Sequence, residues 1–387
     1  MKVGIFVDSY KPIITGVVHT VDLLRRGLEA LGHEVHIFAP ASPGYRDGED
    51  RVYRFHAINL STRVAAPLAI PISRRIFGLI PRLGLDVIHT HHPFSVGRLG
   101  LYFARRLRLP AVYTFHTQYE QYAHYIPLSQ TLVQSLARRL VLDHSERCDV
   151  VICPAPSIRE LLLSYGIRRP IELLPNAIDL RAFEDVDPGD VRTRLGIGPQ
   201  DRVAIYCGRL AYEKNLPFML HALRDVLMEV PGARLVLVGE GTETEALVRL
   251  AATLGLGDRV LFPGRIDYKD IPRYYAAADL FVMTSVTEVG PLALLEAMAS
   301  GLPVVALSAN GAADTVTPGL DGLLTPHDPA EFARAVRYLL TEGAVRREMG
   351  RRGRQTAKRY SIFDTTRRLV EIYQQARASR RASYAVG

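Results

Sequence analysis

Two glutamates in the last third of the chain, Glu288 and Glu296, are separated by seven residues in the stretch TEVGPLALLEAMASGLPVV. Val289-Gly290-Pro291 predicts a turn after an apolar strand, and the next residues predict a helix over about Leu292–Ala299. The N–H groups of the turn and the positive end of the helix suit a phosphate or a network of sugar hydroxyls. A carboxylate accepts hydrogen bonds from the vicinal hydroxyls of ribose or hexose. An isolated glutamate often only caps a helix or faces solvent, but two that bracket a strand-to-helix turn favour a binding role.

Two cations, Arg209 and Lys214, lie in the segment GRLAYEKN, directly after a predicted strand over Val203–Tyr206. At the carboxyl end of a strand, two cations can neutralise a diphosphate leaving group without a metal ion. The alternative is an ordinary solvated pair. The position beyond a strand end favours the functional reading.

A glycine, Gly16, lies in the link between the first predicted strand and its helix, where it permits a phosphate to approach the helix N-terminus. The dinucleotide fingerprint G-x-G-x-x-G is absent from this turn. The stretch that comes nearest to it, Gly239–Thr244 (GEGTET), lacks the third glycine, which argues against nicotinamide binding.

Ten of the 12 histidines lie in the first 175 residues. His89, His91 and His92 lie close together, but no acidic partner with metal-ligand spacing accompanies them, so a metal site is disfavoured. His116 ends a predicted strand over Ala111–Phe115, where it can bond a substrate hydroxyl or phosphate. A core or surface role for any single histidine remains open.

Short apolar strands alternate with helical segments, which predicts two open α/β parallel sheets in series. Such sheets bind ligands beyond the carboxyl ends of their strands. The predicted strands of the first half are Val3–Val7, Val35–Phe38, Val87–His89, Ala111–Phe115 and Val150–Cys153. Those of the second half are Val203–Tyr206, Leu235–Val238, Val260–Phe262, Leu280–Met283 and Val304–Ala306. A helix over Val17–Leu31 is expected to end at Gly32.

A chain of 387 residues predicts two domains with separate cores. We place them at residues 1–175 and 176–360, with the boundary in LPNAID, before an acidic stretch from Glu184 to Pro199. Asp185 and Asp187 in that stretch match the spacing of a metal-binding DxD motif, but we interpret them as solvent-exposed charged residues of the linker. The C-terminal segment 361–387, helical in pattern over Ser361–Ala376, is expected to complete the first domain.

The composition, 48% hydrophobic and 23% charged, is that of a globular protein. Three cysteines without metal-ligand spacing indicate a reducing compartment. The N-terminus lacks the pattern of a signal peptide, and no apolar run could span a bilayer. We therefore expect a cytoplasmic protein, free or attached to the cytoplasmic membrane face.

The basic residues are concentrated in the first half: residues 1–175 hold 21 Lys and Arg against 14 Asp and Glu, and the rest holds 27 against 26. A basic half attracts nucleic acid, anionic lipid or a phosphorylated substrate. Nucleic acid is disfavoured because no aromatic-basic platform is evident. Val64–Pro81, with Arg74 and Arg75, predicts either an amphipathic segment at a membrane interface or a core helix with a solvated basic face.

Taken together and in this order, the E-x7-E motif, GRLAYEKN, LPNAID and the Gly16 turn resemble the retaining glycosyltransferases of family 4. The resemblance covers nearly the whole chain. It implies the GT-B fold, in which two Rossmann-like domains with parallel sheets face a central cleft. It also implies a nucleotide-sugar donor, no tightly bound cofactor and no required metal.

The resemblance also implies roles for single residues. Glu296 would bind the ribose and Glu288 the transferred sugar. Arg209 and Lys214 would hold the diphosphate, with Gly16 packed against it from the other domain. His116 would bond the transferred sugar and assist catalysis. The remaining donor contacts would come from Val289, Gly290, Pro291 and Leu292 through their backbones, and from Ile266 beside the nucleobase.

A narrower resemblance, to the 1,2-diacylglycerol 3-glucosyltransferases, rests on residues 90–127 (THHPFSVGRLGLYFARRLRLPAVYTFHTQYEQYAHYIP) and on SYKPIITGVVHTV. It implies α-transfer of glucose from UDP-glucose to diacylglycerol. Independently of the resemblance, the basic charge of the first domain predicts contact with an anionic membrane surface, and no nucleic acid partner is expected. After Glu288 the chain has Val-Gly-Pro-Leu where that group has a more polar turn, which leaves the donor sugar open. Phosphatidylinositol, a soluble sugar or a glycan precursor remain alternative acceptors, and a non-catalytic polyanion-binding protein is the alternative of another class.

Overall fold

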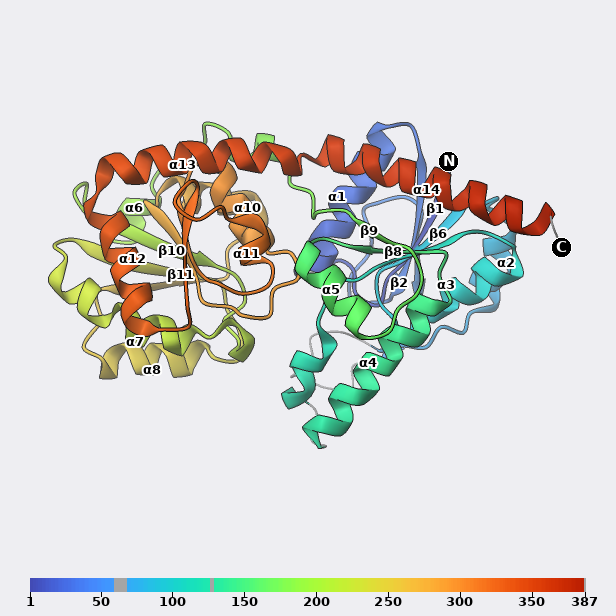
Figure 1. The fold of residues 1–387 in the computed structure, drawn as a ribbon, viewed down its shortest axis with the longest axis horizontal. Coiled ribbons are helices and arrows are strands. Elements are labelled where there is room, and N and C mark those ends of the chain that lie inside the picture. The colour runs from blue at the N-terminus through green and yellow to red at the C-terminus, as the bar shows by residue number, and fades with distance from the viewer. Residues whose placement is uncertain (59–67, 126–128, 386–387) are drawn as a thin grey trace. The chain divides into compact units, whose positions relative to one another are not determined.

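The computed structural model describes residues 1–58, 68–125 and 129–385. The chain divides into two compact units, of which unit 1 is Met1–Ala177 with Ile362–Gly387 and unit 2 is Ile178–Ser361. The sequence placed this boundary between residues 175 and 176. In each unit, helices flank a sheet (Figure 1).

Within the described residues, unit 1 contains a seven-stranded parallel sheet in the order β3-β2-β1-β6-β7-β8-β9. Its strands are β1 (Lys2–Phe6), β2 (Glu34–Pro40), β3 (Val52–Phe55), β6 (Val87–Thr90), β7 (Ala111–Thr114), β8 (Val150–Cys153) and β9 (Ile171–Leu173). A separate antiparallel pair joins β4 (Ala57–Ile58) to β5 (Leu68–Ala69). The helical elements are α1 (Gly16–Ala30), α2 (Arg74–Leu79), η1 (Ile80–Arg82), α3 (Ser95–Arg106), η2 (Tyr119–Tyr125), α4 (Gln130–Glu146), α5 (Pro156–Ser164) and α14 (Ile362–Ala385).

Helix α1 shows how the local sequence sets the ends of an element. Thr15 caps its start, because the Thr15 side chain accepts a hydrogen bond from the backbone N of Val18 at 3.3 Å. Gly32, with φ of 78°, follows its end in the left-handed conformation that glycine adopts without strain. The predicted helix and its glycine stop are therefore confirmed.

The C-terminal helix α14 packs on α1 in unit 1. The approach is close, because a Cβ on Gly27 of α1 would lie 2.1 Å from Oγ1 of Thr366. Leu369, Ile372 and Tyr373 of α14 are fully buried in the core of unit 1. This burial ties the last helix of the chain to the first sheet.

Unit 2 contains a parallel sheet of six strands among the described residues, in the order β12-β11-β10-β13-β14-β15. Its strands are β10 (Arg202–Cys207), β11 (Ala233–Val238), β12 (Val260–Gly264), β13 (Leu280–Met283), β14 (Val304–Leu307) and β15 (Gly322–Thr325). Its α-helices are α6 (Val191–Arg194), α7 (Leu216–Glu229), α8 (Thr244–Thr253), α9 (Ile271–Ala276), α10 (Leu292–Ala299), α11 (Ala312–Thr315), α12 (Pro329–Thr341) and α13 (Gly343–Ala357). Its 3-10 turns are η3 (Leu180–Phe183), η4 (Tyr212–Lys214), η5 (Tyr268–Asp270) and η6 (Lys358–Tyr360).

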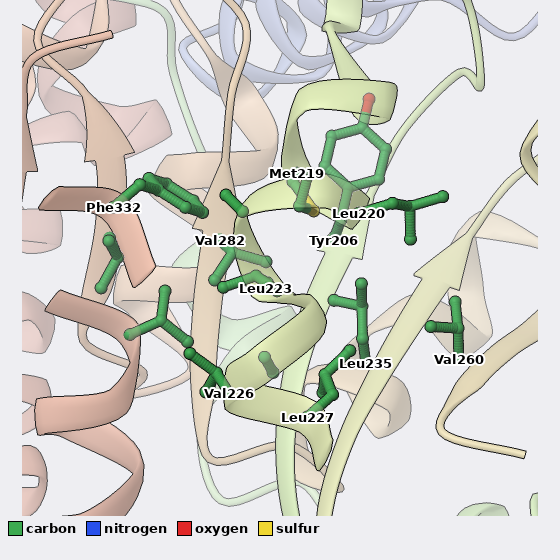
Figure 2. Close-up of a cluster of buried hydrophobic side chains, with 14 of the residues drawn as sticks. Tyr206, Met219, Leu220, Leu223, Val226, Leu227, Leu235, Val260, Val282 and Phe332 are labelled. Carbon is green, nitrogen blue, oxygen red and sulfur yellow. The ribbon is translucent and has the colours of Figure 1, made fainter. Parts of the chain in front are cut away.

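One core of unit 2 lies between α7 and the sheet (Figure 2). Leu227 of α7 lies near Leu235 of β11, and Leu223 of α7 lies near Val282 of β13. Phe332 of α12 belongs to the same cluster. Apolar burial of this kind contributes roughly 25 cal/mol per Å². It fixes the strand ends from which the loops of the candidate site emerge.

All ten predicted strands are present, and the predicted α/β class with two parallel sheets is confirmed. No helix among the described residues combines the length and the apolar character that crossing a membrane requires.

The predicted amphipathic segment at 64–81 lies only partly within the described residues. In the described part, Ile76 and Ile80 are buried in unit 1, whereas Arg74 and Arg75 of α2 are exposed. The ring of Phe77 packs edge-on against Phe103 of α3, with 5.1 Å between centroids. For this part the structure favours the core helix with a solvated basic face; residues 64–67 lie outside the described residues.

Candidate active site

In unit 2, Arg209 follows the carboxyl end of β10 and is held from two sides. The hydroxyl of Tyr206 donates to the backbone O of Arg209 at 3.1 Å. Nη2 of Arg209 donates to Oε1 of Glu213 at 2.5 Å. The Glu213 side chain is only 1% exposed and that of Arg209 is 49% exposed. A buried carboxylate thus anchors one end of a guanidinium whose other end reaches solvent.

The Gly-x-Gly stretch after β11 supports the same loop. Leu210 N donates to Glu240 O at 3.1 Å, and Glu243 N donates to Leu210 O at 2.9 Å. A Cβ on Gly239 would lie 1.9 Å from the carbonyl O of Gly208. These glycines permit close backbone packing, which explains a partial likeness to the dinucleotide fingerprint.

Lys214, at the end of η4, forms an ion pair with Glu288, which follows β13. Nζ of Lys214 donates to Oε1 of Glu288 at 2.6 Å, and the two side chains are 19% and 17% exposed. Burial alone would raise the pKa of Glu288, but the charge of Lys214 and the hydrogen bond from it hold that pKa below its ordinary value. Glu288 is therefore a carboxylate in the unliganded protein.

Side-chain hydroxyls join the backbones of the same two loops. The Thr284 hydroxyl bonds the carbonyl O atoms of Lys214 and Asn215, each at 3.0 Å, and the Ser285 hydroxyl donates to Glu213 O at 3.2 Å. Because Thr284 and Ser285 follow directly after β13, they fix the loop after β10 to the neighbouring strand. These hydrogen bonds hold the loops that carry Lys214 and Glu288 next to each other.

A third loop, after β14, packs against Glu288. Gly311 has φ of 81°, and a Cβ there would lie 2.9 Å from both Cβ and O of Glu288. Only glycine combines this left-handed backbone with so close an approach. Gly311 was not singled out from the sequence.

Helix α10 begins at Leu292 and ends at Ala299, as predicted. Its N-cap is Pro291, whose side chain gives no hydrogen bond to the first turn. Val289 and Pro291 are buried, and Gly290 is partly exposed. A helix N-terminus without a side-chain cap, next to Glu288, suits an anionic or hydroxyl-rich ligand.

Glu296, in the second turn of α10, is held by two tyrosines. Oε1 accepts from the Tyr268 hydroxyl at 3.0 Å and Oε2 from the Tyr275 hydroxyl at 3.1 Å. Burial raises the pKa of Glu296 to about 7, against the opposing effect of both hydroxyls. Ile266, two positions before Tyr268, is partly buried and packs against the hydrophobic cluster of unit 2 that contains Tyr275.

In unit 1, His116 follows β7 and bonds a second histidine. Nδ1 of His91, just after β6, lies 2.8 Å from Nε2 of His116, and the two rings stack at 13°. Burial holds the pKa of each well below its usual value, so both are neutral at pH 7. Gly16 is the exposed first residue of α1, next to its Thr15 cap.

The other histidines of the cluster have partners of their own. His89 bonds the Tyr373 hydroxyl and the Thr114 hydroxyl, each at 2.7 Å, and His92 accepts from Asp8 N at 3.1 Å. Among the residues that the structure describes, no three His, Cys, Asp or Glu side chains are grouped so that they could hold a metal ion.

The structure thus brings Arg209, Lys214 and Glu288 to one edge of the unit 2 sheet and places Glu296 in the adjoining helix. Sequence reasoning missed the residues that hold them, Glu213, Tyr268, Tyr275 and Gly311. Glu213 could have been found as the one acid within GRLAYEKN. The two tyrosines carry no local signal, because their contact with Glu296 depends on the packing of α9 and η5 beside α10.

Two family models match the chain: Glycosyltransferase Family 4 over residues 14–182 and Glycosyl transferases group 1 over residues 190–356. The alpha-monoglucosyldiacylglycerol synthase of Streptococcus pneumoniae is 34% identical over 312 residues, which cover 79% of this chain and 71% of that protein. A protein of the same name from Acholeplasma laidlawii is 30% identical over 79% of this chain and 80% of its own. A GDP-mannose-dependent alpha-mannosyltransferase of Mycobacterium tuberculosis is 30% identical over 84% of each chain.

Solved structures share the fold. Sucrose-phosphate synthase from Thermosynechococcus elongatus superposes with a TM-score of 0.80 at 24% identity, covering 98% of this chain and 99% of that one. Anabaena HepE in complex with UDP-glucose gives a TM-score of 0.77 at 21% identity, covering 97% of this chain and 100% of that one. The chain therefore belongs to the family 4, group 1 glycosyltransferases and is a glycosyltransferase with the GT-B fold.

Proposed function

We propose that this protein is a retaining glycosyltransferase that transfers an α-glucosyl group from UDP-glucose to the free hydroxyl of diacylglycerol. The observation that carries the proposal is the group of Arg209, Lys214 and Glu288 at one carboxyl edge of the unit 2 sheet. It combines two cations for a diphosphate with a carboxylate for a sugar, beside the N-terminus of α10.

The cations act on the leaving group. When the sugar–phosphate bond breaks, negative charge accumulates on the diphosphate, and Arg209, Lys214 and the first turn of α10 stabilise it. Glu213 keeps the Arg209 guanidinium in place for this task. Backbone groups of the turn Val289–Leu292 bond the sugar and the phosphate nearest to it.

Glu288 orients the transferred sugar. Its carboxylate is ion-paired with Lys214, which makes it a poor nucleophile because attack would separate a mostly buried pair. The acceptor hydroxyl therefore attacks from the face that the diphosphate leaves, and the departing phosphate oxygen takes its proton. This order of events retains the α configuration.

The nucleoside is bound by Glu296 and Ile266. The ribose hydroxyls donate to the Glu296 carboxylate, and Ile266 lies beside the base. From unit 1 we assign His116 a hydrogen bond to the transferred sugar and Gly16 a close approach to the diphosphate. We expect that no metal ion is required, because Arg209, Lys214 and the first turn of α10 supply hydrogen-bond donors for the diphosphate.

Support for a lipid acceptor comes from two sides. Two relatives at 34% and 30% identity are named for glucosyldiacylglycerol synthesis. The basic excess of residues 1–175 would also favour an anionic, cytoplasmic membrane face, by about 1 kcal/mol for each residue near the surface.

A second candidate is the same chemistry with another donor or acceptor. It is favoured by the relative that uses GDP-mannose and by the D-inositol 3-phosphate glycosyltransferase of Acidothermus cellulolyticus, 31% identical over 77% of this chain. A polyanion-binding protein without catalysis is not supported, because the chain belongs to an enzyme family.

The test is a panel of radiolabelled donors, UDP-glucose, UDP-galactose and GDP-mannose, each with diacylglycerol vesicles, phosphatidylinositol vesicles and soluble acceptors. We expect glucose on diacylglycerol, with the α configuration by NMR of the product. Transfer of another sugar or to another acceptor would select the second candidate. A β-linked product would refute retention.

A further inference from the structure

Beneath His116 lies a buried neighbour, His91, whose hydrogen bond can determine how His116 meets a substrate. His91 is 0% exposed, and its backbone N donates to Phe6 O at 3.1 Å, so the residue is fixed in the sheet of unit 1. Its Nδ1 lies 2.8 Å from Nε2 of His116. His116 is partly exposed, and because its Nε2 lies against His91, Nδ1 is the ring nitrogen that remains for a ligand.

The bond between two neutral imidazoles has a direction. One ring must donate from an N–H and the other must accept with a bare nitrogen, because a neutral imidazole carries a single ring proton. Which of the two rings donates therefore determines which nitrogen of His116 carries its proton. Burial among His89, His92 and His116 keeps the pKa of His91 far below its usual value, so a doubly protonated His91 is excluded at pH 7.

The surroundings of His91 select the direction. Nε2 of His91 is buried and has no hydrogen-bond partner within the described part of the chain. If His91 carried its proton on Nε2, a buried N–H would be left unpaired, and such orphaned donors are rare in folded proteins. With the proton on Nδ1, only an unpaired acceptor remains, and Nδ1–H donates to Nε2 of His116.

We propose that His91 is a positioning residue that donates from Nδ1 to Nε2 of His116 and thereby holds His116 as the tautomer with its proton on Nδ1. His116 then presents an N–H donor, not an acceptor, to its ligand. The inference rests on the proposed function for one point only, that this ligand is an oxygen of the transferred sugar. A neutral donor of this kind supports an electron-rich sugar oxygen without adding a full charge beside the reacting centre.

The direct test is NMR of the full-length protein labelled with ¹⁵N-histidine, with the His116 signals assigned by their loss in His116→Asn. We expect Nδ1 of His116 to be protonated and Nε2 to be bare in the wild type. In His91→Leu the donor is gone, and the proton should shift toward Nε2, the nitrogen that a free imidazole side chain prefers. A protonated Nε2 in the wild type, or no change in His91→Leu, would overturn the inference.

Two further variants separate positioning from simple damage to the core. Asn at position 91 can offer its amide N–H close to the place of Nδ1, so His91→Asn should keep the wild-type tautomer of His116. His89→Gln alters the neighbouring buried ring, which bonds Tyr373 and Thr114 but not His116, and serves as the matched control with an unchanged His116 signal. A tautomer change in His89→Gln as large as that in His91→Leu would overturn the specific role of His91.

Kinetics supply the link to the reaction. We expect kcat in His91→Leu to fall at least about tenfold, because the wrong tautomer of a catalytic histidine lowers kcat strongly in serine proteases. The donor KM should change less than about twofold, and His91→Asn should recover the wild-type kcat. In a His116→Asn background His91→Leu should have no further effect on kcat, since His91 acts through His116. Additive losses would overturn the inference. If His116→Asn alone leaves transfer unchanged, the proposed role of His116 fails, while the NMR result still decides the tautomer.

Discussion

Lys214 and Glu288 are 74 positions apart in the chain, yet Nζ of one lies 2.6 Å from Oε1 of the other. The pair forms because β10 and β13, whose carboxyl ends carry the two loops, are adjacent strands of one parallel sheet. Both side chains are mostly buried, so each charge depends on the other for compensation. A ligand oxygen at this edge can use the remaining N–H donors of Lys214 while the ion pair with Glu288 stays formed.

Glu288→Gln keeps the size of the side chain but removes the partner charge of Lys214. We expect the free energy of unfolding to fall by roughly 1–3 kcal/mol, and kcat to fall by at least about tenfold while donor affinity changes less. Urea unfolding and steady-state kinetics measure the two effects. The control is Glu348→Gln, an exposed glutamate that pairs with Arg351 and Arg352 on α13, and it should leave both quantities unchanged. Full turnover in Glu288→Gln would refute the role of Glu288.

The loops that carry the site residues could be predicted from the sequence, but the contacts between residues of different loops could not. The strands β1, β10 and β13 are buried on both faces and read as apolar runs, so the loops that follow them could be placed from the sequence. The edge strands β3, β9 and β15 were missed, because half-exposed edges need no continuous apolar run. No local pattern states which strands are neighbours. For that reason neither the Lys214–Glu288 pair nor the His91–His116 bond could be derived.

The titration of Glu296 predicts a pH dependence of nucleoside binding. Its pKa is raised from 4.5 to about 7 in the folded protein, so the carboxyl group is partly protonated at neutral pH. Ribose hydroxyls donate to the ionised form, and binding should therefore strengthen as pH rises toward about 7 and level off above it. Calorimetry with uridine, which lacks a titrating phosphate, should show proton release at pH 6. Glu296→Gln should bind uridine more weakly and without this dependence; a Glu296→Gln variant with the wild-type pH profile would contradict the assignment.

The same shift has a consequence for stability. The unfolded chain loses its proton near 4.5 and the folded protein only near 7, so the folded state binds more protons between these values. The contribution of Glu296 to stability is therefore lost as pH rises from about 4.5 to about 7, and stays lost above that. Urea unfolding of Glu296→Gln relative to the wild type, followed across this window, should show a relative gain with rising pH. A constant difference would show that Glu296 titrates normally.

Gly311 offers a test of how closely Glu288 is held. Gly311→Ala must adopt φ of 81° and also place a Cβ 2.9 Å from Glu288 O, so both strain and a clash arise. Gly319→Ala is the matched control, because Gly319 has φ of 76° but no atom within 4 Å of a new Cβ. We expect Gly319→Ala to lose roughly 1 kcal/mol of stability in urea unfolding from the strained backbone alone, Gly311→Ala to lose more because the clash adds to the strain, and only Gly311→Ala to lose turnover. Equal kcat values for the two would mean that the position of Glu288 is not set by this contact.

The contact of Glu213 with Arg209 predicts that a change at Glu213 weakens the binding of the diphosphate but not the binding of the nucleoside. Glu213→Gln removes the charge that holds Nη2 of Arg209, and the guanidinium should then sample more conformations above the edge of the sheet. UDP affinity should fall by about tenfold, because an ordered cation for the diphosphate is lost, whereas uridine affinity should stay the same. Glu331→Gln, in the first turn of α12, removes an exposed partner of Arg334 and is the control with both affinities unchanged. Calorimetry with the two ligands decides the matter: a parallel loss for UDP and uridine would indicate general damage to unit 2, and an unchanged UDP affinity would show that Arg209 needs no anchor.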